Sequence, residues 1–171
     1  MPIGNICAKM DDALRAYLID VGAGAEADIF PGKWSANKTL PVTICWAHSA
    51  RPMQEAPYSN TWEVEAFIEV RTSGVQEKNQ SNTDPKDAAN TRTAATMDAF
   101  FAGVTDDTSA PLAAAITQAA SVEDIAVLTV IACKVVEMNQ GFNPRAVRDM
   151  GNAWIDTIHL QLLVCPGQVS V

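Results

Sequence analysis

The sequence has little of what catalytic and metal-binding proteins usually display. Among its 171 residues are only two histidines, and its four cysteines lie far apart without a CxxC pair. No HExxH, GxSxG or Walker motif occurs, so the sequence gives no indication of a zinc site, a nucleophile elbow or a phosphate-binding loop. We therefore expect no catalytic residue, no metal and no cofactor. We expect the cysteines to be free thiols that pack as small apolar side chains.

Positive charge is also scarce. Twelve lysines and arginines are outnumbered by twenty aspartates and glutamates, which gives a formal net charge of −8. Proteins that hold nucleic acid tightly need basic side chains to displace counterions from the phosphates. The charge balance argues against a tight nucleic-acid binder and suits a surface that nucleic acid passes without binding.

Long apolar runs are missing as well. No run approaches the ~20 residues of a membrane helix, and the first residues show no basic segment followed by an apolar core, so no secretory signal is expected. A length of 171 residues with 48% hydrophobic residues fits one globular domain that spans residues 1–171.

Residues 22–27 read GAGAEA, which formally matches a dinucleotide-binding fingerprint. That fingerprint must follow a strand and open a helix, so that helix N–H groups face the pyrophosphate. Here it follows residues 10–21, whose apolar spacing predicts a helix. We interpret the segment as a turn, with Gly22 as the helix C-cap.

Residues 60–70 read NTWEVEAFIEV and alternate in character. One face takes Trp62, Val64, Ala66, Ile68 and Val70, and the other takes Glu63, Glu65, Phe67, Glu69 and Arg71. A two-residue period with one apolar face predicts a half-buried antiparallel strand with its glutamates on the outer side. Two such carboxylates could flank a glycosidic bond, but an exposed face offers nothing to separate their pKa values. A solvated face is the favoured interpretation.

The remaining segments complete an α+β fold. The other predicted strands are residues 40–46, 126–136 and 153–165; further helices begin at Pro85 and span residues 109–120; loops cover residues 51–59, 72–83 and 139–152. Residues 126–136 are apolar on both faces, which is typical of a central strand. Residues 153–165 alternate instead, with Ile158, Leu160, Leu162 and Val164 on the inner face and Thr157, His159 and Gln161 on the outer face. The sequence therefore predicts a four-stranded, mostly antiparallel sheet with about three helices packed on it.

A ligand pocket is the alternative from a different functional class. Trp62 and Trp154 each open a predicted strand, and Cys45 lies three residues from His48. A small-molecule-binding or hydrolytic α+β domain could use a pocket near Trp62, Trp154 and Cys45. For Cys45 itself, core packing is favoured over a Cys–His dyad.

Two of these segments together resemble a known family. NTWEVEAFIEV and GNAWIDTIHLQLLV (residues 151–164), with the intervening loop and helices, look like the signature strands of tail-terminator proteins of long-tailed bacteriophages. The resemblance implies a non-enzymatic virion protein whose rings, usually hexameric, cap the tail tube, end its polymerisation and offer a head-joining surface. A neck or head-completion protein of a tailed phage is the alternative within the same class.

The resemblance also implies partners and a location. The partners are further copies of the chain, the tail tube protein and head–tail connector or neck proteins, while DNA passes through without specific binding. The protein would reside in the tail–neck region of the virion after assembly in the host cytoplasm. In such a ring, a neighbouring subunit could cover one face of residues 126–136.

Three groups of residues are candidate contact sites of this ring. The candidate channel-facing or subunit-interface residues are Glu63, Glu65, Glu69, Arg71, His159 and Gln161. The candidate tube-docking loop, between Arg71 and Lys86, contains Gln76, Glu77, Lys78, Asn79 and Lys86. Arg145 and Arg148 are candidates for contact with the connector or a neighbouring subunit. Negative charge along the channel would repel passing DNA.

Overall fold

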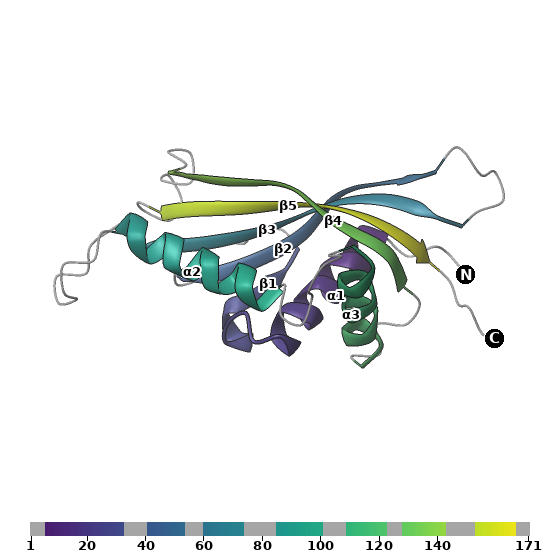
Figure 1. Ribbon diagram of the computed structural model, residues 1–171, viewed down its shortest axis with the longest axis horizontal. Helices are drawn as coiled ribbons and strands as arrows, with labels where there is room; N and C mark the ends of the chain where they lie inside the picture. Colours follow the sequence, from purple (N-terminus) through teal and green to yellow (C-terminus); the bar gives the residue numbers. More distant parts are fainter. Residues whose placement is uncertain are drawn as a thin grey trace.

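The computed structural model describes residues 6–32, 41–53, 60–73, 85–100, 109–122, 128–142 and 153–166. In chain order the elements are α1 (Ile6–Asp20), a short 3₁₀ helix (Glu26–Asp28), β1 (Ile29–Pro31), β2 (Val42–Pro52), β3 (Trp62–Ser73), α2 (Pro85–Phe100), α3 (Ser109–Val122), β4 (Leu128–Phe142) and β5 (Ala153–Pro166) (Figure 1). Within those ranges, none of the helices has both the length and the apolar character needed to cross a membrane.

One sheet organises the molecule, and its strand order is β1-β2-β3-β5-β4. β1 runs parallel to β2, and the other neighbouring pairs are antiparallel. The helices α1, α2 and α3 lie on the same face of the sheet (Figure 1). The predicted α+β class is confirmed, but the sheet has five strands and is mixed. The sequence did not reveal β1, because three residues are too few to show a two-residue period.

The apolar core lies between the helices and the inner face of β3 and β5. Val64, Ala66 and Ile68 pair with Leu162, Leu160 and Ile158, and all six side chains are fully buried. Directly paired residues share a face of the sheet, so the alternation predicted for both strands is confirmed. The inner face meets Met10, Leu14 and Leu18 of α1, together with Leu112 and Ile116 of α3, in one hydrophobic cluster.

The prediction that residues 126–136 form a central strand is wrong. β4 forms one edge of the sheet, and β5 lies between β3 and β4. A strand that is apolar on both faces can be buried on two sides, but this pattern does not show whether the strand has one neighbour in the sheet or two. β4 also continues to Phe142, so part of the loop predicted from residue 139 belongs to this strand.

α1 ends as its sequence predicts. Gly22 has φ +71°, its N–H donates to the carbonyl of Ile19 at 3.0 Å, and the Ala23 N–H donates to the carbonyl of Leu18 at 2.9 Å. These two bonds form a Schellman motif, in which glycine adopts the left-handed conformation without steric cost. GAGAEA is therefore a turn that leads from α1 toward β1.

The predicted starts of α2 and α3 are confirmed, whereas α1 begins at Ile6 rather than at the predicted residue 10, and several ends differ. α2 begins at Pro85 and α3 at Ser109, as predicted. α2 ends at Phe100, whereas the sequence predicted Gly103, which lies outside the described residues. β2 continues through Pro52 into the segment predicted as a loop from residue 51.

Candidate functional site on the uncovered face and edge of the sheet

The face of the sheet opposite the helices carries the polar and aromatic residues of β2, β3 and β5. We call this surface the open face. It includes Trp46 and Arg51 from β2, Glu63, Glu65, Phe67, Glu69 and Arg71 from β3, and His159 and Gln161 from β5. All six predicted channel-facing or interface residues lie on this face, and strand register places Glu65 opposite Gln161 and Phe67 opposite His159.

An aromatic row crosses the centre of the open face. The rings of Phe67 and His159 stack with centroids 4.6 Å apart and planes 13° apart, and Trp46 stacks against Phe67 at 5.3 Å and 23°. His48 meets Phe67 edge-on at 6.0 Å. Both faces of Phe67 are thus occupied by neighbouring side chains. The row strengthens the pairing of three strands and leaves no free Phe67 face on which a nucleobase could stack.

Two of the three glutamates on this face are paired with arginines. Arg51 Nε donates to Glu63 Oε2 at 3.0 Å and Arg51 Nη2 donates to Glu63 Oε1 at 3.2 Å, while Gln161 donates a further hydrogen bond to Glu63. Arg71 Nε donates to Glu69 at 2.8 Å. The bonds from Arg51 and Gln161 hold the pKa of Glu63 below its ordinary value. A general acid at neutral pH needs the opposite shift.

Glu65 is more weakly paired than the other two glutamates, and the end of the open face near β1 is more buried than the rest. Glu65 lies 4.0 Å from Arg51 and is only loosely compensated. The Glu69–Arg71 pair is 15% exposed on each side, and Ile44, which pairs with Glu69, is buried. The face is therefore a network of alternating charges rather than a bare acidic row.

The cysteines behave as apolar residues in this structure. Cys7, Cys45, Cys133 and Cys165 are free thiols, and burial raises the pKa of Cys133 to about 12 and that of Cys45 still further. Cys45 points into the core, where its Sγ lies 3.5 Å from the carbonyl oxygen of Phe30, whereas His48 is exposed next to Phe67. The two side chains form no dyad. In the described part of the chain, no three His, Cys, Asp or Glu side chains form a metal-binding group.

The alternative, a single pocket near Trp62, Trp154 and Cys45, does not agree with the strand register. Trp62 pairs with Val164 at one end of β5, and Trp154 lies at the other end, opposite Thr72. Ten residues of strand separate the two positions, which corresponds to about 33 Å. Both tryptophans open strands, but the antiparallel register places these starts at opposite ends of the sheet.

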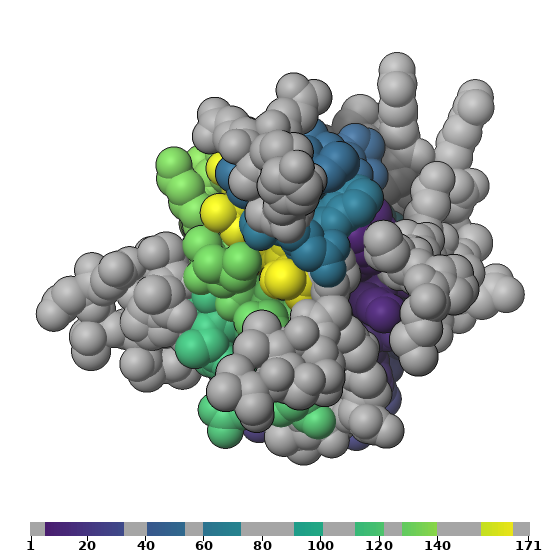
Figure 2. Space-filling model, turned by 90° about the vertical axis from the view of Figure 1, so that its right-hand side faces the viewer, coloured from purple at the N-terminus to yellow at the C-terminus, as the bar shows by residue number. Residues whose placement is uncertain are grey.

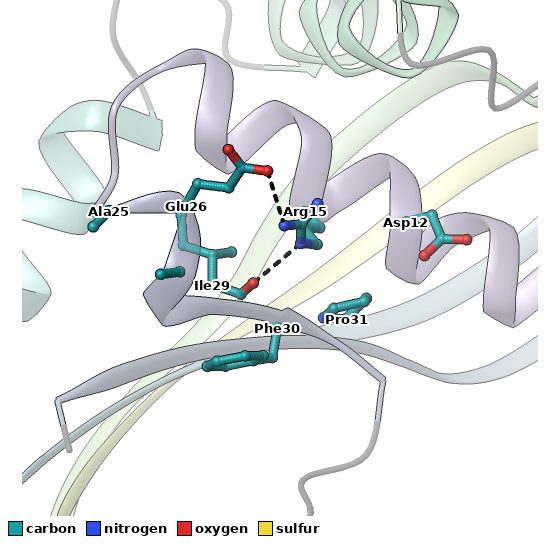
Figure 3. Close-up of a pocket in the computed structure, with 8 residues that line it drawn as sticks. Asp12, Arg15, Ala25, Glu26, Ile29, Phe30 and Pro31 are labelled. Carbon is teal, nitrogen blue, oxygen red and sulfur yellow. Dashed lines mark hydrogen bonds and ion pairs between the residues drawn. The ribbon is translucent and has the colours of Figure 1, made fainter. Parts of the chain in front are cut away.

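A groove does exist between α1 and β1, with a volume of about 810 Å³ (Figure 3). Arg15 lies at its centre and donates to the carbonyl of Ile29 at 3.1 Å and to Glu26 at 3.4 Å. Phe30 and Pro31 form part of its wall. The guanidinium is already paired within the groove, so its charge is not available to select an anionic ligand.

The free edge of the sheet is the second part of the candidate site. The exposed large hydrophobic side chains of the described residues are Ile131, Val136 and Met138, with 49%, 48% and 46% of their surfaces exposed, and all lie on β4. Ile131 and Val136 occupy the two positions at which the register with β5 shifts. We call these three residues the β4 edge patch. Figure 2 shows β4 in light green at the surface, next to β5 in yellow.

The other predicted contact residues lie mainly outside the described ranges. These are Gln76, Glu77, Lys78 and Asn79 of the expected docking loop, and Arg145 and Arg148. Lys86 is the second residue of α2 rather than part of a loop. The edge patch was missed because Ile131 and Val136 belong to the run of residues 126–136, which looks uniformly apolar in sequence, so nothing marks these two side chains as exposed.

Asp11 joins the helix layer to β2 at the other side of the sheet. β1 pairs with β2 only from Thr43 to Cys45, and beyond this point the Ala47 N–H donates to the Asp11 carboxylate. Burial raises the pKa of Asp11 from its ordinary value of 3.8 to about 6; the bond from Ala47 opposes this shift and the nearby Asp12 adds to it.

Asp11 is expected to make the fold less stable as pH rises from about 4 to about 6. In this window the folded chain holds more protons than the unfolded chain, so the free energy of unfolding falls with pH. The full shift would correspond to about 3 kcal/mol, and solvent screening at this half-buried carboxyl reduces it to about 1 kcal/mol. Urea unfolding of the wild type and of Asp11→Asn at several pH values tests this.

Asparagine keeps an acceptor for Ala47 but has no charge, so the difference between the two proteins isolates this carboxyl. The variant should match the wild type near pH 4 and be more stable than it at neutral pH. Parallel curves for the two proteins would show that another group is responsible.

A scan against protein-family models finds no match for the sequence, and a search of curated protein sequences finds none either.

Proposed function

We propose that the chain is a structural assembly protein of a long-tailed phage: a tail terminator that forms a ring, caps the tail tube, ends its polymerisation and offers a surface for head joining. The observation that supports this most directly is the β4 edge patch. All the large apolar side chains that are exposed among the described residues lie on this one edge strand, and exposed apolar side chains grouped on one element mark a candidate interaction surface.

The form of the edge suggests how a neighbour would bind. The irregularities at Ile131 and Val136 interrupt the regular edge ladder of β4, and such bulges discourage the addition of a further strand. The neighbour would therefore contact side chains rather than extend the sheet. The opposite edge, formed by β1 and β2, is different in shape and sequence. A contact between two different surfaces repeats around an axis, and it closes into a ring when the rotation between neighbouring subunits divides a full turn.

The open face fits the wall of a channel in such a ring. Glu63 is paired with Arg51 and Glu69 with Arg71, so the charge is mixed, and the Glu65 carboxylate adds negative charge at the centre. Phe67 offers no free ring face to a base. DNA would meet a polar wall without basic clusters or stacking platforms and would pass without specific binding. The tail tube protein and the head–tail connector are the further partners of the ring.

Light scattering and electron microscopy of the purified chain test the proposal. Between about 1 and 100 µM the mass should rise with concentration toward a ring, by mass action. Images should show closed rings, and a reconstruction should place the open face toward the central channel. A chain that stays monomeric across this range, or a ring whose channel is lined by the helices, would contradict the proposal.

A further inference from the structure

The sheet surface beneath α2 is polar, unlike the surface beneath α1 and α3. The buried polar side chains of the described residues are Thr43, Thr72, Thr93, Thr96 and Asp156. Thr93 and Thr96 belong to α2, which packs on β3 and β5. The inner faces of α1 and α3 are instead made of leucine, isoleucine, methionine and alanine.

Strand register places the sheet residues of this group together. Val70 of β3 pairs with Thr43 on one side and with Asp156 on the other, and Thr72 lies two residues further along the same face. Thr93 Oγ1 donates to Asp156 Oδ2 at 2.6 Å, which connects α2 to this row by one hydrogen bond. We call Thr72 and Asp156, which lie on the two strands that α2 contacts, the polar floor of α2, and Thr43 continues the same row onto β2.

Most hydroxyl groups at this interface gain nothing from being buried. The Oγ1 atoms of Thr43, Thr72 and Thr96 are inaccessible to solvent and have no hydrogen-bond partner among the described residues. A buried polar atom without a partner loses its bonds to water and gains none in return. The buried Asp156 side chain is stabilised by one hydroxyl where water would offer several bonds. Contact between α2 and the floor therefore contributes little to holding the helix down.

The C-terminal end of α2 is held differently. Phe100 is fully buried, its ring meets the ring of Tyr17 edge-on at 5.3 Å, and its carbonyl accepts a hydrogen bond from the Tyr17 hydroxyl. Figure 1 shows this end of α2 near the centre of the molecule, with the rest of the helix running along the sheet away from α1. Phe100, together with Met97 and Ala99, which pack against the same core, anchors this end of the helix, whereas Thr93, one turn before Met97, contacts the polar floor.

We propose that α2 is a hinged flap, which lifts from the polar floor as a unit and pivots about Phe100 while the rest of the domain stays folded. Local openings of this kind occur where an element has few apolar contacts, at a lower free energy than global unfolding. The flap concerns the single chain and stands whether or not the chain forms rings.

Hydrogen exchange of the wild-type chain decides the question. Amide hydrogens at residues 91–96 of α2 should exchange at least about tenfold faster than those at residues 10–18 of α1, at a rate that does not depend on protein concentration. Equal protection in the two helices would mean that α2 opens only when the whole domain unfolds, and the proposal would be overturned.

A reversible disulfide between α2 and β5 provides a second measurement. Replacing Thr93 and Asp156 by cysteine puts one thiol on α2 and one on β5 at the point where Thr93 Oγ1 now lies 2.6 Å from Asp156 Oδ2. The oxidised double variant should protect α2 to the level of α1, and reduction of the same protein should restore fast exchange. Rapid exchange of α2 in the cross-linked form would show that its amides open without lifting of the helix, which would also overturn the proposal.

Discussion

Replacing Ile131 and Val136 by glutamate is expected to weaken self-association at least about 100-fold. Both side chains are about half exposed on the edge strand, so the substitutions alter no core contact. In a neighbour's interface, however, each would replace an apolar contact with a carboxylate that lacks a partner, and burying such a charge is strongly unfavourable. Sedimentation or light scattering over a concentration series measures the change.

The control adds the same charge elsewhere. Ala94 and Ala95 are exposed on α2, so Ala94→Glu with Ala95→Glu makes the chain more negative by the same amount without touching β4. Circular dichroism and urea unfolding should show that all the proteins remain folded. If both double variants associate equally weakly, general repulsion on a chain of net charge −8 explains the loss. If neither variant weakens association, β4 is not the interface.

Strands with one wet face were the easiest elements to predict. In β3 and β5 the alternation of apolar and polar residues reports directly which face is buried, and the predicted inner faces match the structure. In β4 nearly every residue of the predicted segment is apolar, so the sequence does not indicate which of its side chains are exposed. Its edge position depends on β5 pairing with β3, a contact between segments distant in the chain.

The residues of the open face were predicted, but their interactions were not. Periodicity places Phe67 and Glu63 on the outer side of β3, whereas the ring stack and the ion pair depend on the register with β2 and β5. Register is set by the combined packing of three strands and not by any one of them. The burial of the polar floor was not predicted for a related reason, because threonine and aspartate are usually exposed residues. Nothing in the local sequence marks Thr72 or Asp156 as buried.

Phe100→Ala is expected to lower the free energy of unfolding by about 3–5 kcal/mol. The Phe100 ring is fully buried and packs edge-on against Tyr17, so its removal leaves a cavity between α1 and α2 and ends an aromatic contact. Domains of this kind have only about 5–15 kcal/mol of stability in total. Urea denaturation measures the loss, provided that the slope of the free energy of unfolding against urea concentration is the same in both proteins.

Tyr17→Phe provides the matched control, because it keeps the ring pair and removes only the hydroxyl that donates to the Phe100 carbonyl. It should cost about 1–2 kcal/mol, the range for one lost buried hydrogen bond. If Phe100→Ala costs no more than this control, the ring is not an anchor, and α2 is held along its length rather than at one end. A large loss for Phe100→Ala with a small one for Tyr17→Phe locates the attachment of the helix in the apolar contact. This result would also explain how α2 remains attached to the core although its contacts with the polar floor stabilise it little.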